Sequence, residues 1–149
     1  MAVLIQNRQE KHEICLKTVR KKAQTILSAL GSPDSELSIV ITDDADIAEL
    51  NETYLNHIGP TNVISFPMQE GEFSGVSPLL LGDVVISADT ALKEGEEAGT
   101  GLEYRFYELL IHGILHLFGY DHELSDEEYD RMEAKQNELL EVLKKADEK

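Results

Sequence analysis

The sequence predicts a single α/β (α+β) domain in which helices cover a small mixed sheet. The chain has 149 residues, which is the size of one domain, and 42% of them are hydrophobic, which is enough for a normal core. Strand-like and helix-like segments alternate along the chain. We find neither an internal repeat nor a second domain, so residues 1–149 are expected to form one unit.

The N-terminal third predicts two strands around one helix. The apolar run Val3–Ile5 predicts a first strand within residues 1–8. Apolar residues then recur at three- and four-residue intervals over residues 9–30, as in an amphipathic helix, and Gly31–Pro33 stops it. Residues 37–41 alternate and are rich in β-branched side chains, which indicates the second strand.

The next segment predicts a helix and a third strand. Thr42–Asp44 offers N-caps for a helix that continues through Tyr54, because short polar side chains accept hydrogen bonds from the first turn. Gly59–Pro60 breaks this helix. Residues 62–66 are then expected to form a strand that Pro67 ends.

A loop, a buried strand and a helix follow. Residues 68–80 contain two Gly and one Pro and predict an exposed loop. Residues 82–86 are typical of a buried strand. Ser87 is expected to cap a helix over residues 88–98, which Gly99–Gly101 ends.

The C-terminal part predicts two helices. Residues 102–118 have apolar groups around most of the circumference, as a central helix requires. Ser125 and Glu128 form a capping box for a last helix to about Lys145. Residues 146–149 predict a charged, frayed tail.

Three histidines on and after the central helix indicate a metal site. His112, His116 and His122 have the spacing H-x-x-x-H-x-x-G-x-x-H. Residues four apart share a helix face roughly 6 Å apart, and Gly119 can adopt the left-handed conformation that returns the chain towards them. Three neutral imidazoles with an open position are the ligand set of catalytic zinc. We expect one Zn²⁺ per chain, although imidazole also suits other divalent transition metals.

The residues around these histidines separate two families. The spacing resembles that of the metzincin proteases, but their general-base glutamate is replaced by Gly113. The fuller pattern H-G-x-L-H-L-x-G-Y-D-H resembles the YbeY family of bacterial endoribonucleases of rRNA maturation. The resemblance continues in Leu50–Asn51, Pro60–Pro67 and Leu81–Ser87, and covers roughly residues 37–140.

This resemblance implies a fold, an activity and partners. The fold would be a four-stranded mixed sheet covered by about five helices, with a zincin-like metal cleft beside a central HxxxHxxGxxH helix. The activity would be zinc-dependent, single-strand-specific endoribonuclease cleavage in rRNA maturation, at the small-subunit rRNA 3′ end, and in ribosome quality control. The expected partners are single-stranded rRNA, the small ribosomal subunit and assembly factors, without a dinucleotide cofactor.

Several other residues are candidates for the chemistry. Zinc held by three histidines can supply hydroxide near neutral pH and polarise a phosphoryl oxygen. Asp121 could handle the proton that Gly113 cannot, or it could orient a histidine ring. The family places Thr61, Asn62 and Ser65 at the cleft, where they could instead make only turn and strand hydrogen bonds.

Asp83 has two possible roles as well. It could orient a histidine ring from outside the ligand set, or it could cap the turn that follows its strand.

One position departs from the family pattern. After Leu50–Asn51–x–x–Tyr54 the family usually carries Arg, whereas this chain has Leu55, which has neither charge nor a donor for phosphate. His57 or Arg105 could take that role. Two alternatives therefore stay open: a non-catalytic, metal-binding ribosome-assembly factor, and a zinc metallopeptidase-like hydrolase, against which Gly113 argues.

The charge is unevenly distributed. The net charge of −16 opposes binding of a polyanion. Residues 1–30, however, hold six basic side chains against two acidic ones, whereas the remainder holds seven against 27. The N-terminal helix is therefore the candidate contact with RNA or a ribosomal partner, or else a solvated amphipathic face.

The remaining features indicate a cytoplasmic protein. The single Cys15 excludes an intramolecular disulfide, fits a reducing compartment and is expected to be a buried, inert thiol. Residues 1–11 contain no signal-peptide pattern, and no apolar run approaches the ~18 residues of a membrane span.

Overall fold

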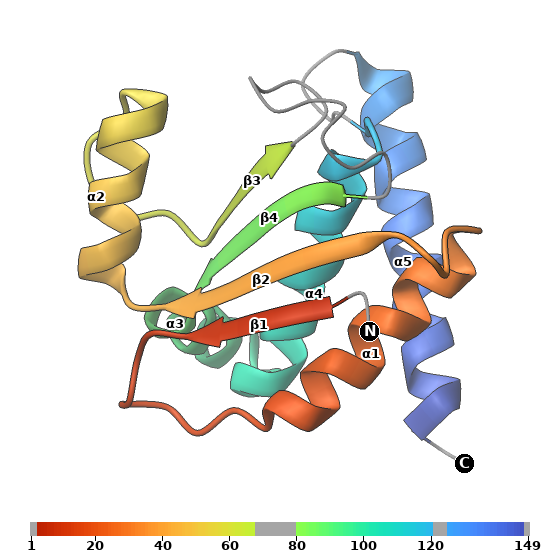
Figure 1. Ribbon diagram of the computed structural model, residues 1–149, viewed down its shortest axis with the longest axis horizontal. Helices are drawn as coiled ribbons and strands as arrows, with labels where there is room; N and C mark the ends of the chain where they lie inside the picture. Colours follow the sequence, from red (N-terminus) through yellow and green to blue (C-terminus); the bar gives the residue numbers. More distant parts are fainter. Residues whose placement is uncertain (1–2, 68–79, 121–124, 148–149) are drawn as a thin grey trace.

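The computed structural model describes residues 3–67, 80–120 and 125–147. These ranges form four strands and five helices (Figure 1), which are, in chain order, β1 (Val3–Asn7), α1 (Leu16–Ala29), β2 (Glu36–Thr42), α2 (Asp44–Leu55), β3 (Val63–Pro67), β4 (Leu80–Ser87), α3 (Ala88–Ala98), α4 (Gly101–Leu117) and α5 (Asp126–Asp147). The predicted α/β domain is confirmed.

The sheet is mixed and has the strand order β1-β2-β4-β3. β1 and β4 each pair with β2 in parallel, whereas β3 pairs with β4 antiparallel. Parallel neighbours cannot be joined by a hairpin, so a helical crossover connects β1 to β2. β1 and β3 are the edge strands, and Figure 1 shows β3 on the side of the sheet nearer to α2.

The two faces of the sheet are covered unequally. Val84 and Ile86 of β4 join a large buried cluster with residues of α1, α3, α4 and α5. Val85 points the other way, because side chains alternate along a strand, and joins Ile47 of α2 and Ile64 of β3. The four-helix face therefore holds most of the core, and α4 contributes seven buried hydrophobic residues to it.

The first helix is shorter than predicted. It begins at Leu16 rather than residue 9. The Gln9 side chain accepts from the His12 backbone N–H (2.9 Å) and donates to the His12 carbonyl (3.0 Å) and to Asn7 Oδ1 (3.0 Å). These local bonds replace the hydrogen bonds that a helix would have made there.

The expectation of a buried Cys15 is wrong for the same reason. Cys15 is the N-cap residue of the shortened helix, and its thiol is exposed. The Thr18 hydroxyl donates to Cys15 Sγ (3.3 Å) and is the main cause of a lowered thiol pKa.

Most predicted element ends lie within two residues of the observed ones, and the predicted caps are confirmed. Asp43, Ser87 and Ser125 accept hydrogen bonds from the backbone N–H three residues on, at 2.9, 3.2 and 3.1 Å. Pro67 continues β3, which an edge strand tolerates.

Two segments that were predicted to be irregular, the loop at 68–80 and the tail at 146–149, include residues of a strand or a helix. Leu80, assigned to the loop at 68–80, opens β4, and the rest of that loop lies outside the described residues. α5 extends through Asp147 into the predicted tail. Within the described ranges, no helix combines the length and the apolar character needed to span a bilayer.

Candidate functional site

His112 and His116 converge on one point beside α4. Their Nε2 atoms are 3.1 Å apart, and their ring centroids are 4.6 Å apart with the planes at 79°. Two nitrogens bound to one tetrahedral ion at about 2.0–2.1 Å would be about 3.3 Å apart. The two imidazoles therefore fit a shared divalent cation with little rearrangement.

The chain turns sharply after His116. Gly119 has φ 93°, its N–H donates to the His116 carbonyl (3.1 Å), and the Tyr120 N–H donates to the Leu115 carbonyl (3.1 Å). These two bonds form a Schellman motif, in which a glycine in the left-handed region ends a helix. The predicted left-handed conformation of Gly119 is confirmed.

Two predicted site residues follow this turn. His122 and Asp121 lie outside the described residues. The part of the chain that the structure describes contains no group of three or more His, Cys, Asp or Glu side chains placed to hold a metal. The full three-histidine ligand set stays a prediction.

Gln136 of α5 orients the first histidine. Its Oε1 lies 3.3 Å from His112 Nδ1, and because a carbonyl oxygen can only accept, this contact favours the tautomer with the proton on Nδ1. Nε2 then keeps its lone pair on the side of His116, as a metal ligand requires.

Gln136 is not among the site residues predicted from the sequence, although one signal for it is present. Gln136 is a half-buried polar residue on the same stripe of α5 as the buried Met132, Leu139 and Leu143. A polar side chain on an otherwise apolar helix face indicates that a polar group in the protein interior contacts it.

A cavity opens beside His112. It has a volume of about 300 Å³ and is lined by residues of α4 and α5, namely Arg105, His112, Tyr129, Met132, Glu133 and Gln136. The lining combines an imidazole, an amide, a guanidinium and a carboxylate with apolar groups.

Arg105 and Asn62 meet on one carboxylate. Arg105 Nε contacts Glu94 Oε1 at 3.0 Å, and its Nη1 contacts Glu108 Oε1 at 3.4 Å. Asn62 Nδ2 donates to both oxygens of Glu94, at 3.2 and 3.3 Å. The structure thus joins these two predicted residues, but the charge of Arg105 is shared between two carboxylates.

Ser65 and Gly113 show how closely α4 approaches the sheet. Ser65 Oγ donates to the Gly113 carbonyl at 2.8 Å. A Cβ added at Gly113 would lie 2.6 Å from Val84 Cγ1 and 3.2 Å from Val63 Cγ2. Position 113 therefore faces the sheet and has no room for the glutamate of the metzincin motif.

Other predicted residues lie elsewhere. The Asp83 side chain shares a strand face with Val85, opposite Val84 and α4, and therefore points away from the helix that carries His112 and His116. Thr61 is half-buried, directly before Asn62.

The end of α2 lies next to β3. His57 is exposed just beyond the helix. Leu55 is 42% exposed, and the neighbouring Tyr54 ring contacts the Phe66 ring of β3 at 5.7 Å between centroids. The side chain of an arginine or lysine at position 55 would therefore be exposed to solvent.

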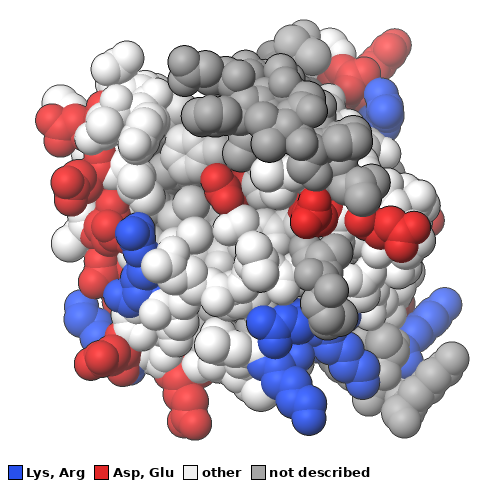
Figure 2. Space-filling view, viewed as in Figure 1, with Lys and Arg blue, Asp and Glu red and all other residues white. Residues whose placement is uncertain are grey.

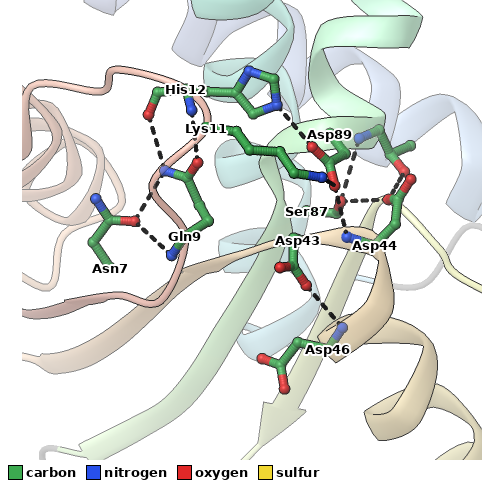
Figure 3. Close-up of polar contacts among 10 residues, drawn as sticks. Asn7, Gln9, Lys11, His12, Asp43, Asp44, Asp46, Ser87 and Asp89 are labelled. Carbon is green, nitrogen blue, oxygen red and sulfur yellow. Dashed lines mark hydrogen bonds and ion pairs between the residues drawn. The ribbon is translucent and has the colours of Figure 1, made fainter.

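A second polar cluster joins the N-terminal segment to α2 and α3 (Figure 3). His12 Nε2 is 2.7 Å from Asp89 Oδ1, while Asp89 Oδ2 accepts from the Asp44 backbone N–H at 3.1 Å and lies 3.7 Å from Lys11 Nζ. Asp44 Oδ1 in turn accepts from the hydroxyls of Ser87 and Thr90, both at 2.6 Å. Burial acts to raise the pKa of Asp89, but the Asp44 N–H, His12 and Lys11 together hold it below its usual value.

Comparison with known proteins gives a consistent result. A family model described as Endoribonuclease YbeY matches residues 4–144. Endoribonuclease YbeY of Geobacter metallireducens is 56% identical over 146 residues, which cover 97% of each chain. Endoribonuclease YbeY of Aquifex aeolicus is 47% identical over 137 residues, covering 92% of this chain and 89% of its own.

A solved structure shares the fold. The solution structure of TM1509 from Thermotoga maritima covers 95% of this chain and 88% of its own, with a TM-score of 0.65 and 24% sequence identity. At that identity the likeness concerns the fold alone.

Proposed function

This chain belongs to the YbeY endoribonuclease family, and on that premise we propose that it is a zinc-dependent endoribonuclease specific for single-stranded RNA. We further propose that it works in the cytoplasm on the small-subunit rRNA 3′ end, in rRNA maturation and ribosome quality control. Its partners would be the small ribosomal subunit and assembly factors.

The convergence of His112 and His116 beside the cavity carries this proposal. Together with His122 they would hold the ion, and Gln136 would keep His112 in the tautomer that a ligand needs. Zinc in such a site activates water near neutral pH and stabilises charge on a phosphoryl oxygen. Another divalent transition metal would fit the same nitrogen donors.

The residues around the ion would position RNA. The cavity between α4 and α5 would admit a phosphodiester group beside His112. Arg105 lines that cavity and is the nearest candidate for a phosphate contact, although it would have to turn from Glu94 and Glu108 to make one. Asp121 is the candidate for moving the proton of the attacking water.

The residue at position 113 argues against metallopeptidase activity. Peptidases with this histidine spacing use a glutamate there as general base. In this chain the residue is glycine and its side-chain position is filled by Val84. Casein should therefore not be cleaved.

Two observations favour a second candidate, a metal-binding assembly factor without catalysis. The guanidinium that lines the cavity is neutralised by two carboxylates, and Leu55 replaces the arginine of the family pattern.

A cleavage assay decides between the candidates. Wild type with one zinc per chain should cut a single-stranded RNA carrying a small-subunit 3′ end, should leave its duplex form intact, and should stop when a chelator removes the metal. His116→Ala is the matched control. RNA left uncut by the zinc-loaded wild type would support the assembly factor instead.

A further inference from the structure

Helix α1 carries a charge unlike the rest of the chain. It holds Lys17, Arg20, Lys21 and Lys22 and no acidic residue, in a protein with 29 Asp and Glu against 13 Lys and Arg. Its inner stripe is buried in the core and consists of Val19, Ala23, Ile26 and Leu27. The basic residues therefore lie beside or opposite this stripe.

Three of these basic residues form part of an open groove, which we call the α1 groove. It has a volume of about 660 Å³ and is lined by residues of one helix face, namely Lys17, Arg20, Lys21, Gln24, Thr25 and Ser28. Figure 2 shows Lys and Arg side chains gathered over α1, whereas acidic side chains dominate the side of the molecule where α2 lies. The face from residue 17 to residue 28 is about 16 Å long.

Five basic residues elsewhere in the described chain are paired with carboxylates. Ion pairs join a basic side chain to a carboxylate at Arg8–Asp46, Lys11–Asp89, Arg105–Glu94, Arg131–Glu128 and Lys135–Glu138. Lys17, Arg20 and Lys21 make no ion pair with any carboxylate of residues 3–67, 80–120 and 125–147. In a protein of net charge −16, three neighbouring cations that pair with no carboxylate of the described residues favour an external anion.

Arg20 is also held in place. Its Nε donates to the carbonyl of Val3 at 3.3 Å, which fixes the side chain against β1. A guanidinium held in this way pays less side-chain entropy when its remaining N–H groups bind a phosphate. Beyond the three basic residues, the groove is lined by polar side chains that suit a sugar-phosphate backbone, namely Gln24, Thr25 and Ser28.

We propose that the α1 groove binds the backbone of the RNA substrate at a distance from the histidine pair. That the bound anion is RNA rests on the proposed function, whereas the location of the anion-binding site at α1 does not. Lys22 Nζ lies 4.5 Å from the centre of the Tyr107 ring, so α1 passes α4 at that level. Tyr107 precedes His116 by roughly 14 Å along the helix axis. Only an RNA that extends beyond the scissile site can reach both places.

Two triple variants test the groove. The groove variant combines Lys17→Gln, Arg20→Gln and Lys21→Gln. The control variant combines Arg8→Gln, Lys93→Gln and Lys145→Gln, which also removes one Arg and two Lys from exposed positions. Both variants therefore change the net charge equally.

Binding is measured first, by fluorescence anisotropy of labelled single-stranded RNA with metal removed by chelator. Each cation on a single strand contributes about 0.7 to the slope of log K against log salt, so the groove variant should lose about 2 from the slope. When salt rises from about 50 to about 200 mM, the RNA affinity of the groove variant should therefore fall by about 16-fold less than that of wild type. The control variant should match wild type.

Cleavage is measured next with zinc-loaded protein. For RNA of about 24 nucleotides the groove variant should show a KM about 10-fold higher with kcat unchanged, whereas for RNA of about 6 nucleotides it should match wild type. Equal salt slopes and equal KM values for the two triple variants would overturn the proposal.

Two further outcomes are distinguishable. If polyglutamate displaces the labelled RNA as well as unlabelled RNA does, the groove binds polyanions in general and the assignment to RNA is overturned. If zinc-loaded wild type cleaves neither RNA, the proposed function fails, while the binding measurement still decides whether the groove holds RNA.

Discussion

The molecule contains two histidine clusters that differ in their partners. His12 lies 2.7 Å from a carboxylate that also accepts a backbone N–H and contacts a lysine. His112 and His116 face each other at 3.1 Å, and the hydrogen-bond partner of His112 is a neutral amide. The first cluster contains its own counter-charges and joins three segments, whereas the second directs lone pairs at a shared point. A histidine pair with an outer amide partner is suited to a cation, and a histidine with a carboxylate is suited to holding chain segments together.

The largest expected effect comes from replacing a histidine of the metal site, compared with replacing the histidine of the other cluster. His116→Ala should lower the bound metal sharply and reduce RNA cleavage by at least about 10³-fold, because several kcal/mol of charge stabilisation depend on the ion. Its free energy of unfolding without metal should change by no more than about 1 kcal/mol. Metal analysis, single-turnover cleavage and urea unfolding measure these quantities.

His12→Ala is the matched control for that experiment. It should leave metal content and cleavage unchanged and lower the stability instead. Wild-type metal content in His116→Ala would remove the distinction between the two clusters.

Gln136→Leu should weaken the metal site without removing it. Loss of a partner that orients a metal-binding histidine typically costs 10- to 100-fold in affinity, so about that loss is expected in competition with a chelator. The ¹⁵N chemical shifts of the His112 ring, measured without metal, should lose the preference for a proton on Nδ1. Gln136→Glu, which keeps an acceptor, should retain that preference. An unchanged tautomer and affinity in Gln136→Leu would show that another group orients His112.

Asp89→Asn tests the cluster that contains its own charges. The pKa of Asp89 is lowered in the folded protein, so the carboxylate adds stability above the ordinary value of 3.8, and this contribution is lost as pH falls through the lowered value. The variant should lose about 1–3 kcal/mol of unfolding free energy at pH 7. The gap to wild type should narrow below about pH 4.

Urea unfolding at pH 7 and pH 3 measures this gap, with the exposed Asp34→Asn as control. A gap that stayed constant with pH would mean that the carboxylate charge contributes nothing.

Leu55→Arg gives the smallest expected effect. The side chain at the end of α2 is 42% exposed, so an arginine should be tolerated within about 0.5 kcal/mol. If the histidine site lacks a free cation for phosphate, the added guanidinium should raise single-turnover RNA cleavage by about 10-fold, short of the 10²–10³ of a preorganised donor. Leu55→Lys separates bidentate contact from charge alone. A folded Leu55→Arg variant with unchanged cleavage would indicate that another residue already fills this role.

The parts of this structure that follow from local chemistry were predictable from the sequence. The four strands, the five helices and the caps at Asp43, Ser87 and Ser125 depend on periodicity and on contacts within one turn. The convergence of His112 and His116 follows from their spacing of four residues on one helix.

The partners of those residues were not predictable, because they come from distant parts of the chain. Gln136 is 24 residues from His112, and Asp89 is 77 residues from His12. The contact with Asp89, together with the Gln9 side chain, keeps residues 9–15 out of the first helix, which periodicity alone had extended to residue 9. Alternation along β4 separates Asp83 from Val84, but only the packing of α4 reveals which of the two faces that helix.

The close approach at Gly113 also limits how this protein can change over evolutionary time. A single substitution to glutamate would place a Cβ 2.6 Å from Val84 Cγ1, so the helix would have to lift from the sheet before any new chemistry could begin. A smaller residue at Val84 would make room, but on its own it would leave a cavity in the core beneath α4. Each first step is expected to lower the stability of the fold, and neither alone provides the general base with its space. The two kinds of hydrolase that share this histidine spacing are thus separated by a valley that one mutation at a time does not cross.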